Sequence, residues 1–183
     1  MPNNQVANPI TQRNIDTILA WLNAHNCQDM KAIDYYTEDI EIVEMPTGVV
    51  YRGMDKMREL ARMAYRRKGS KELTHIIATE TEACVEYIAR ADMSEPLTEE
   101  EKRSGLHGID ISKANFSIEP FAIPVCYTCH FTEAGKIDRV REYWDVATMT
   151  RQFGIESIKS RLLRFFMRRR SGNGRSARAK DSG

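Results

Sequence analysis

The most constraining feature of this chain is a pair of short β-rich runs around a tight turn. Residues 40–45 read Ile-Glu-Ile-Val-Glu-Met and alternate in period two, the turn Pro46-Thr47-Gly48 follows, and Val49-Val50-Tyr51 resumes the pattern. This arrangement is typical of a β-hairpin. Further β-rich runs occupy residues 73–81, 83–93, 122–132 and 136–143. Strands joined by tight turns run antiparallel, so the pattern predicts one antiparallel sheet.

Helical periodicity surrounds these strands. Ile15, Ile18, Leu19 and Leu22 recur at helical spacing after Thr11, a possible cap, and residues 23–26 end this helix. A shorter helical piece is expected at 29–36, another helix opens at Gly53, and a last one begins near Asp145. Helices that pack on one sheet predict an α+β domain.

The 183 residues suffice for one compact domain with a tail. We expect a loose N-terminus at 1–10 and a folded domain at 11–154, which contains a long polar loop at 94–118. A basic amphipathic helix is expected at 155–170 and a flexible tail at 171–183. The loop is predicted to be a mobile cover near the pocket mouth, with Leu106 and His107 close to the opening.

Charge and cysteine content exclude several classes of protein. Residues 155–183 hold nine Lys/Arg and two Asp/Glu, whereas the rest holds eighteen against twenty-four, so the body lacks the basic surface of a nucleic-acid binder. The basic helix could contact a membrane surface, but docking on the body is favoured. No secretory signal, membrane span or disulfide framework is recognisable, which favours the cytoplasm. Cys126 and Cys129 face opposite sides of a strand, so zinc is not expected.

Two stretches resemble a known family. One runs from Tyr35-Tyr36-Thr37-Glu38-Asp39-Ile40 through Glu44-Met45-Pro46-Thr47-Gly48 to Tyr51-Arg52-Gly53, and the other from Gly135-Lys136-Ile137 through Arg141-Glu142-Tyr143-Trp144-Asp145 to Arg151-Gln152-Phe153-Gly154. Together they resemble the SnoaL-like branch of the NTF2-like superfamily over roughly 11–154, without 94–118. The resemblance implies a cone in which a curved antiparallel sheet wraps around N-terminal helices and an apolar pocket, and it implies a homodimer. Members include polyketide cyclases, limonene-1,2-epoxide hydrolases, scytalone dehydratase and non-catalytic binding domains.

A sharper likeness involves Arg90, Asp92 and Asp145. These positions resemble the Asp-Arg-Asp set of the limonene epoxide hydrolases, which implies Asp145 as base, Asp92 as acid and Arg90 as the bridge between them. Arg90 and Asp92 share a strand face, and we expect all three side chains to converge in one pocket. Without the resemblance, a helix cap is the favoured interpretation of Asp145, and a surface pair is the commoner arrangement for Arg90 with Asp92.

The hydrolases hold their attacking water where this chain has Ile42 and Glu44. Ile42 cannot bind water, which argues against hydrolysis by the family route but leaves the nucleophile open. With water the protein is a hydrolase, and with a hydroxyl of the substrate the product is a ring. Glu44 is either an additional acid–base group or an outward-facing strand residue. His75 and His107 are further pocket candidates, although each is also compatible with an ordinary hydrogen-bonded or solvated role. The residues expected to line the pocket with Ile42 are Trp21, Tyr36 and Tyr65.

The resulting hypothesis is a cofactor-independent enzyme of secondary metabolism that acts on a hydrophobic small molecule. Epoxide opening, as a hydrolase or as a ring-forming cyclase or isomerase, is the leading reaction. The first alternative is a SnoaL-like polyketide cyclase, which closes a ring by an intramolecular aldol reaction with Asp145 moving the protons. The second is a non-catalytic NTF2-like module that binds a ligand or a protein. Arg90 separates the first two, because only the epoxide mechanism requires it inside the pocket.

Overall fold

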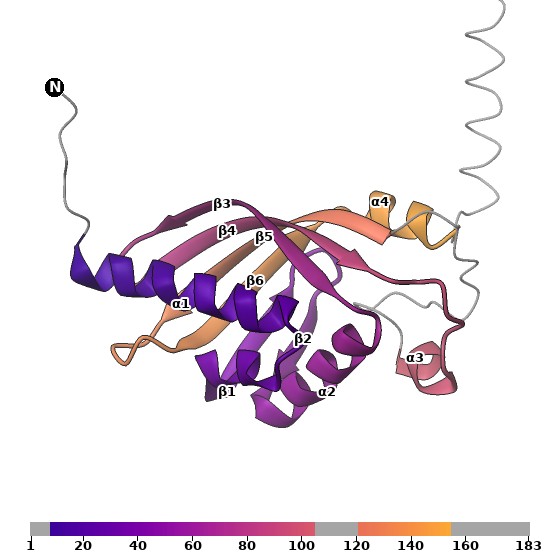
Figure 1. The fold of residues 1–183 in the computed structure, drawn as a ribbon, viewed down its shortest axis with the longest axis horizontal. Coiled ribbons are helices and arrows are strands. Elements are labelled where there is room, and N and C mark those ends of the chain that lie inside the picture. The colour runs from indigo at the N-terminus through magenta and orange to yellow at the C-terminus, as the bar shows by residue number, and fades with distance from the viewer. Residues whose placement is uncertain (1–7, 105–120, 155–183) are drawn as a thin grey trace, which may run out of the picture.

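The computed structural model describes residues 8–104 and 121–154 of the chain (Figure 1). The predicted helix at 155–170, the tail at 171–183, residues 105–118 of the predicted loop, and with them Leu106 and His107, lie outside the described residues. The elements are α1 (Pro9–Asn26), η1 (Met30–Tyr35), β1 (Tyr36–Glu44), β2 (Val49–Arg52), α2 (Gly53–Arg66), β3 (Ser70–Ala78), β4 (Glu82–Ala91), α3 (Glu99–Ser104), β5 (Phe121–Phe131), β6 (Ile137–Trp144) and α4 (Val146–Gln152). The predicted α+β class is confirmed.

The sheet has six strands in the order β2-β1-β6-β5-β4-β3. Its neighbouring strands are antiparallel with one exception: β1 and β6 run parallel, with Val43 opposite Arg141 and Glu44 opposite Glu142. The expectation of a purely antiparallel sheet is therefore wrong at this pair. The tight turns, such as the one at Gly135 (φ +77°), fix the direction of consecutive strands. No such turn joins β1 to β6, which are distant in the sequence.

The two faces of the sheet differ in their burial. Along β4, Ala83, Val85 and Tyr87 are buried, whereas Glu86 and Arg90 between and after them are exposed. Alternate residues of a strand point to opposite faces, so the odd-numbered positions of β4 define the inner face. Helices α1 and α2 lie on this inner side, as Figure 1 shows. We call the opposite side the outer face.

Helix α1 is fixed at both ends. It begins at Pro9 rather than near Thr11, because the side chain of Asn8 caps it by accepting a hydrogen bond from the Ile10 N–H at 2.9 Å. The buried side chain of Asn14 donates to the carbonyls of Thr79 and Glu80, each at 3.0 Å. These bonds secure the helix to the β3–β4 turn. Among the described residues, no helix is both long and apolar enough to cross a membrane.

Candidate active site

A cavity of about 240 Å³ lies between the inner face of the sheet and the helices. Its walls are mainly aromatic and aliphatic, and they come from α1, η1, α2 and all six strands. Six residues proposed from the sequence line this cavity: Trp21, Tyr36, Ile42, Glu44 and Tyr65 in its walls, and Arg90 at its rim. An apolar cavity with a few polar groups is the usual form of a small-molecule site.

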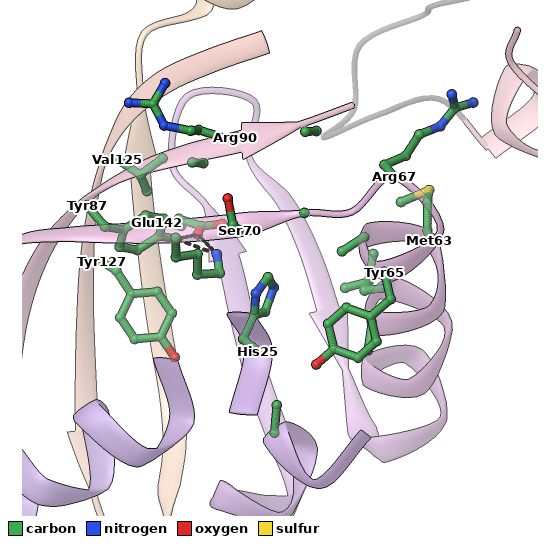
Figure 2. Close-up of a pocket in the computed structure, with 18 of the residues that line it drawn as sticks. His25, Met63, Tyr65, Arg67, Ser70, Tyr87, Arg90, Val125, Tyr127 and Glu142 are labelled. Atoms are coloured by element: carbon green, nitrogen blue, oxygen red, sulfur yellow. Dashed lines mark hydrogen bonds and ion pairs between the residues drawn. The ribbon is translucent and has the colours of Figure 1, made fainter. Parts of the chain in front are cut away.

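Three polar side chains meet inside this apolar space. Lys71 on β3 donates a hydrogen bond from Nζ to the Tyr87 hydroxyl at 2.8 Å, and that hydroxyl in turn donates to Oε1 of Glu142 on β6. The Lys71 ammonium lies 3.9 Å from the same carboxylate oxygen. The side chains of Lys71 and Glu142 are only 16% and 13% exposed, so the pair is shielded from bulk water. We call these residues the Lys71–Tyr87–Glu142 relay; Tyr87 and Glu142 are labelled in Figure 2.

The backbone of Lys71 is held by the end of α1. The side-chain amide of Asn26 donates to the Lys71 carbonyl at 2.9 Å and accepts from the Lys71 N–H at 2.7 Å. This two-way pairing satisfies the Lys71 N–H and C=O groups at the free edge of β3, where a further strand would otherwise bind. The ammonium also lies 4.3 Å from the ring centroid of Tyr87 and 5.4 Å from that of Trp21. Both ring faces attract a cation at these distances.

A second buried carboxylate lies beside the relay. Glu44 is opposite Glu142 in the parallel β1–β6 register, and neighbouring strands are about 4.8 Å apart. The Glu44 side chain accepts a hydrogen bond from the indole N–H of Trp144. The position of Glu44 in the cavity wall agrees with an acid–base or ligand-binding role and disagrees with an outward orientation.

Burial changes the proton affinities of the cavity groups. It raises the pKa of Tyr87 well above the usual range, and the nearby Glu142 carboxylate acts in the same direction. Burial lowers the pKa of Lys71, although Glu142 and Glu44 oppose this shift. Burial, reinforced by the Lys71 charge, also lowers the pKa of His25 to about 3. Tyr87 therefore remains a proton donor at neutral pH, and His25 remains uncharged.

A buried ion pair closes the cavity at the α2 end. The guanidinium of Arg67 binds both carboxylate oxygens of Glu101 on α3, at 2.9 and 2.6 Å, and donates to the carbonyls of Glu95 and Pro96. The two side chains are 7% and 8% exposed. The expected loop at 94–118 thus contains a short helix, α3, and Glu101 and Leu97 contribute to the cavity wall.

The predicted convergence of Arg90, Asp92 and Asp145 is wrong. Arg90 is an even-numbered residue of β4, and its guanidinium binds Glu72 at 2.8 Å and is 49% exposed. It belongs to the cavity rim, but in Figure 2 its side chain points away from the cavity centre. Asp92, 37% exposed, follows the end of β4 and binds Lys68 at 3.0 Å and Ser94. Strand alternation explains this result, because Tyr87 and Ala89 occupy the inward positions.

Asp145 is the N-cap of α4. Its carboxylate accepts hydrogen bonds from the N–H groups of Ala147 and Thr148 at 3.1 and 2.9 Å, and it is not among the residues that line the cavity. Hydrogen bonding to Thr148 lowers the pKa of the carboxyl, so Asp145 is ionised. A carboxylate at a helix N-terminus stabilises the helix, which is the structural alternative considered for this residue.

His75 also lies outside the cavity. It is exposed on β3, opposite Glu86 of the outer face. Thr74 has no partner in the β3–β4 register, which passes from Leu73 opposite Tyr87 to His75 opposite Glu86. This bulge reverses the alternation, so His75 points outward although Lys71, four residues earlier, points inward.

Lys71, Tyr87 and Glu142 were not predicted from the sequence. The inward alternation of β4 contained a signal for Tyr87, because Ala83, Val85 and Tyr87 form the apolar half of the strand. Glu142 stands at the inward position two residues before Trp144, within the stretch that carried the family resemblance. Neither signal distinguishes a catalytic group from a core residue.

No protein-family model and no curated protein matches the chain. Solved structures do. The epoxide hydrolase/cyclase-like enzyme SalBIII, described in pyran ring formation in polyether salinomycin, has 19% identity and a TM-score of 0.57, over 75% of this chain and 94% of that one. A candidate SnoaL-like polyketide cyclase from Jannaschia sp. CCS1 has 11% identity and a TM-score of 0.62, over 84% and 99%. An NTF2-like protein of unknown function from Cytophaga hutchinsonii has 13% identity and a TM-score of 0.52, over 79% and 98%.

The chain has the NTF2-like fold. At these identities the likeness concerns the fold, and the chemistry must be argued from the site.

Proposed function

We propose that this protein is an acid–base enzyme that closes a ring in an apolar carbonyl compound by an intramolecular aldol reaction. The observation that carries the proposal is the Lys71–Tyr87–Glu142 relay inside an otherwise apolar cavity. A base, a cationic donor and a neutral donor in one shielded space are the groups that enolisation and carbon–carbon closure require.

Each group has a defined task in this mechanism. The Glu142 carboxylate removes a proton from the carbon next to a substrate carbonyl, and the Lys71 ammonium stabilises the negative charge that forms on the carbonyl oxygen. The enolate carbon then attacks a second carbonyl of the same molecule. Tyr87 delivers a proton to the new alkoxide and recovers one from Glu142, to which it is already hydrogen-bonded. The apolar walls strengthen these electrostatic interactions by excluding water.

The orientation of Arg90 supports aldol closure over epoxide opening by an Asp-Arg-Asp set. That set requires the guanidinium inside the pocket, whereas Arg90 binds exposed Glu72. The solved structures described as candidate polyketide cyclases are consistent with aldol chemistry. The base of this mechanism is Glu142 instead of Asp145, because Asp145 caps α4.

Epoxide opening by an internal hydroxyl is the second candidate. Ile42 lies in the cavity wall and offers no group to hold an attacking water, so a hydroxyl of the substrate would be the nucleophile. Glu142 would activate this hydroxyl, and Lys71 or Tyr87 would protonate the epoxide oxygen. The likeness to SalBIII, described in pyran ring formation, supports this alternative.

Proton exchange in acetophenone tests the proposal without knowledge of the natural substrate. In D₂O, the wild-type protein should accelerate exchange of the methyl protons, as followed by NMR. Glu142→Gln should lower this catalysis by about 10²–10⁴-fold, because an amide cannot act as a base. Glu72→Gln is the matched control, since Glu72 is exposed on the outer face.

Exchange that is absent in the wild type, or equally fast in a folded Glu142→Gln variant, would contradict the enolisation mechanism. Ring closure of an apolar hydroxy-epoxide by the same protein, without acetophenone exchange, would favour the second candidate instead.

A further inference from the structure

Lys71 is the only lysine among the described residues that line the cavity. Its closest polar partner is the uncharged Tyr87 hydroxyl at 2.8 Å, whereas the Glu142 carboxylate lies farther away at 3.9 Å. A buried ammonium is usually held by a carboxylate in direct contact. In this site the direct contact is a group that can both accept and donate a proton.

The hydrogen bonds provide a route by which the ammonium can lose its charge. A proton passes from Lys71 to the Tyr87 hydroxyl while Tyr87 passes its own proton to Glu142, and the result is a neutral amine and a neutral carboxylic acid. Two neutral groups avoid the cost of keeping two charges in a water-poor cavity. The effect of burial on the pKa of Lys71 favours the same state.

We propose that Lys71 is a nucleophile that captures apolar aldehydes and ketones as a covalent imine. The neutral Nζ adds to the carbonyl carbon to give a carbinolamine. The carboxylic acid of Glu142, through Tyr87, then protonates the hydroxyl, which leaves as water while the nitrogen lone pair forms the C=N bond. The product is a protonated imine beside a Glu142 carboxylate, and the net charge is unchanged.

The surroundings of Lys71 suit this cationic product. The ring faces of Tyr87 and Trp21 flank the nitrogen at 4.3 and 5.4 Å, and Glu44 stands opposite Glu142 in the strand register. The imine also increases the acidity of the neighbouring carbon, which aids the proton removal assigned to Glu142. The inference rests on the carbonyl substrate of the proposed function and adds a covalent intermediate to it.

Reductive trapping tests this inference. The protein is incubated at pH 7 with naphthaldehyde and cyanoborohydride, and the modified lysines are located by peptide mass mapping. Lys71 should be modified several-fold faster than exposed Lys68, because burial lowers the pKa of Lys71 and so increases the neutral fraction that attacks a carbonyl. Lys71→Met should lose this fast modification, whereas Lys68→Arg should retain it.

Modification of Lys71 no faster than that of Lys68 in the wild-type protein would overturn the inference. This comparison within one folded protein stays decisive even if Lys71→Met fails to fold. Acetophenone exchange without trapping would overturn only the covalent route and leave Lys71 as a hydrogen-bond donor. Trapping without exchange would support the nucleophile and overturn the proposed function.

Discussion

The two faces of the sheet carry similar charged groups in different environments. On the inner face, Lys71 and Glu142 are largely shielded from water, whereas on the outer face Arg90 and Glu72 form a closer pair in solvent. Water weakens the outer pair to about 0–1 kcal/mol and competes for both partners. The inner pair is largely shielded from water, so its electrostatic interaction is weakened less. Burial, rather than the spacing of charged residues, therefore distinguishes the candidate site from the surface.

Because successive residues of a strand point to opposite faces of the sheet, residues of both environments lie within a few positions of one another. Tyr87 and Arg90 are three positions apart on β4, and they point to opposite sides of the sheet. The Arg-x-Asp spacing predicted that two charged residues share a strand face, but it could not show which face of the sheet this is. A shift of one residue along a strand moves every side chain to the other face.

The largest difference that we expect between shielded and exposed charges is in the free energy of unfolding, and it concerns the adjacent residues Arg67 and Lys68. Arg67→Ala leaves Glu101 buried without its guanidinium and should destabilise the fold by about 3–5 kcal/mol. Lys68→Ala removes the exposed pair with Asp92 and should cost at most about 1 kcal/mol. Urea denaturation followed by circular dichroism measures both. Equal losses for the two variants would show that burial does not govern these ion pairs.

The sequence was sufficient to predict most of the fold. Period-two alternation located the strands, and Gly135 marked the turn that joins β5 to β6. The parallel pairing of β1 with β6 was not predictable from turns, since it depends on the closure of the whole sheet. The inward orientation of Lys71 was also not predictable, because a lysine on an edge strand normally faces water. Its orientation depends on the bulge at Thr74, which the hydrophobic pattern does not reveal.

A smaller effect is expected on the acid sensitivity of the fold, and it concerns His25. His25 in the cavity wall has a folded-state pKa of about 3, below the value of 6.5 for an exposed histidine. The unfolded chain therefore binds a proton below pH 6.5 that the folded chain excludes, and stability falls as the pH drops from 6.5 towards 3. At pH 5 this loss amounts to about 2 kcal/mol.

His25→Phe should remove that part of the acid sensitivity, while the same change at exposed His75 should leave it intact. Thermal unfolding at pH 7 and pH 5 provides the comparison, because other titrating groups contribute equally to all three proteins. An acid-induced loss of stability that is identical in His25→Phe and the wild type would contradict the shielded environment of His25.

The smallest effect distinguishes the two roles considered for Asp145. As a cap that accepts from Ala147 and Thr148, it should tolerate Asp145→Asn with little loss, whereas Asp145→Ala should destabilise the fold by about 1 kcal/mol. Both variants should keep the acetophenone exchange of the wild type. A catalytic base predicts a different order, since asparagine would abolish the reaction as completely as alanine does. Parallel measurement of unfolding and exchange therefore separates the two roles. Loss of exchange in a fully stable Asp145→Asn protein would identify Asp145, instead of Glu142, as the catalytic base.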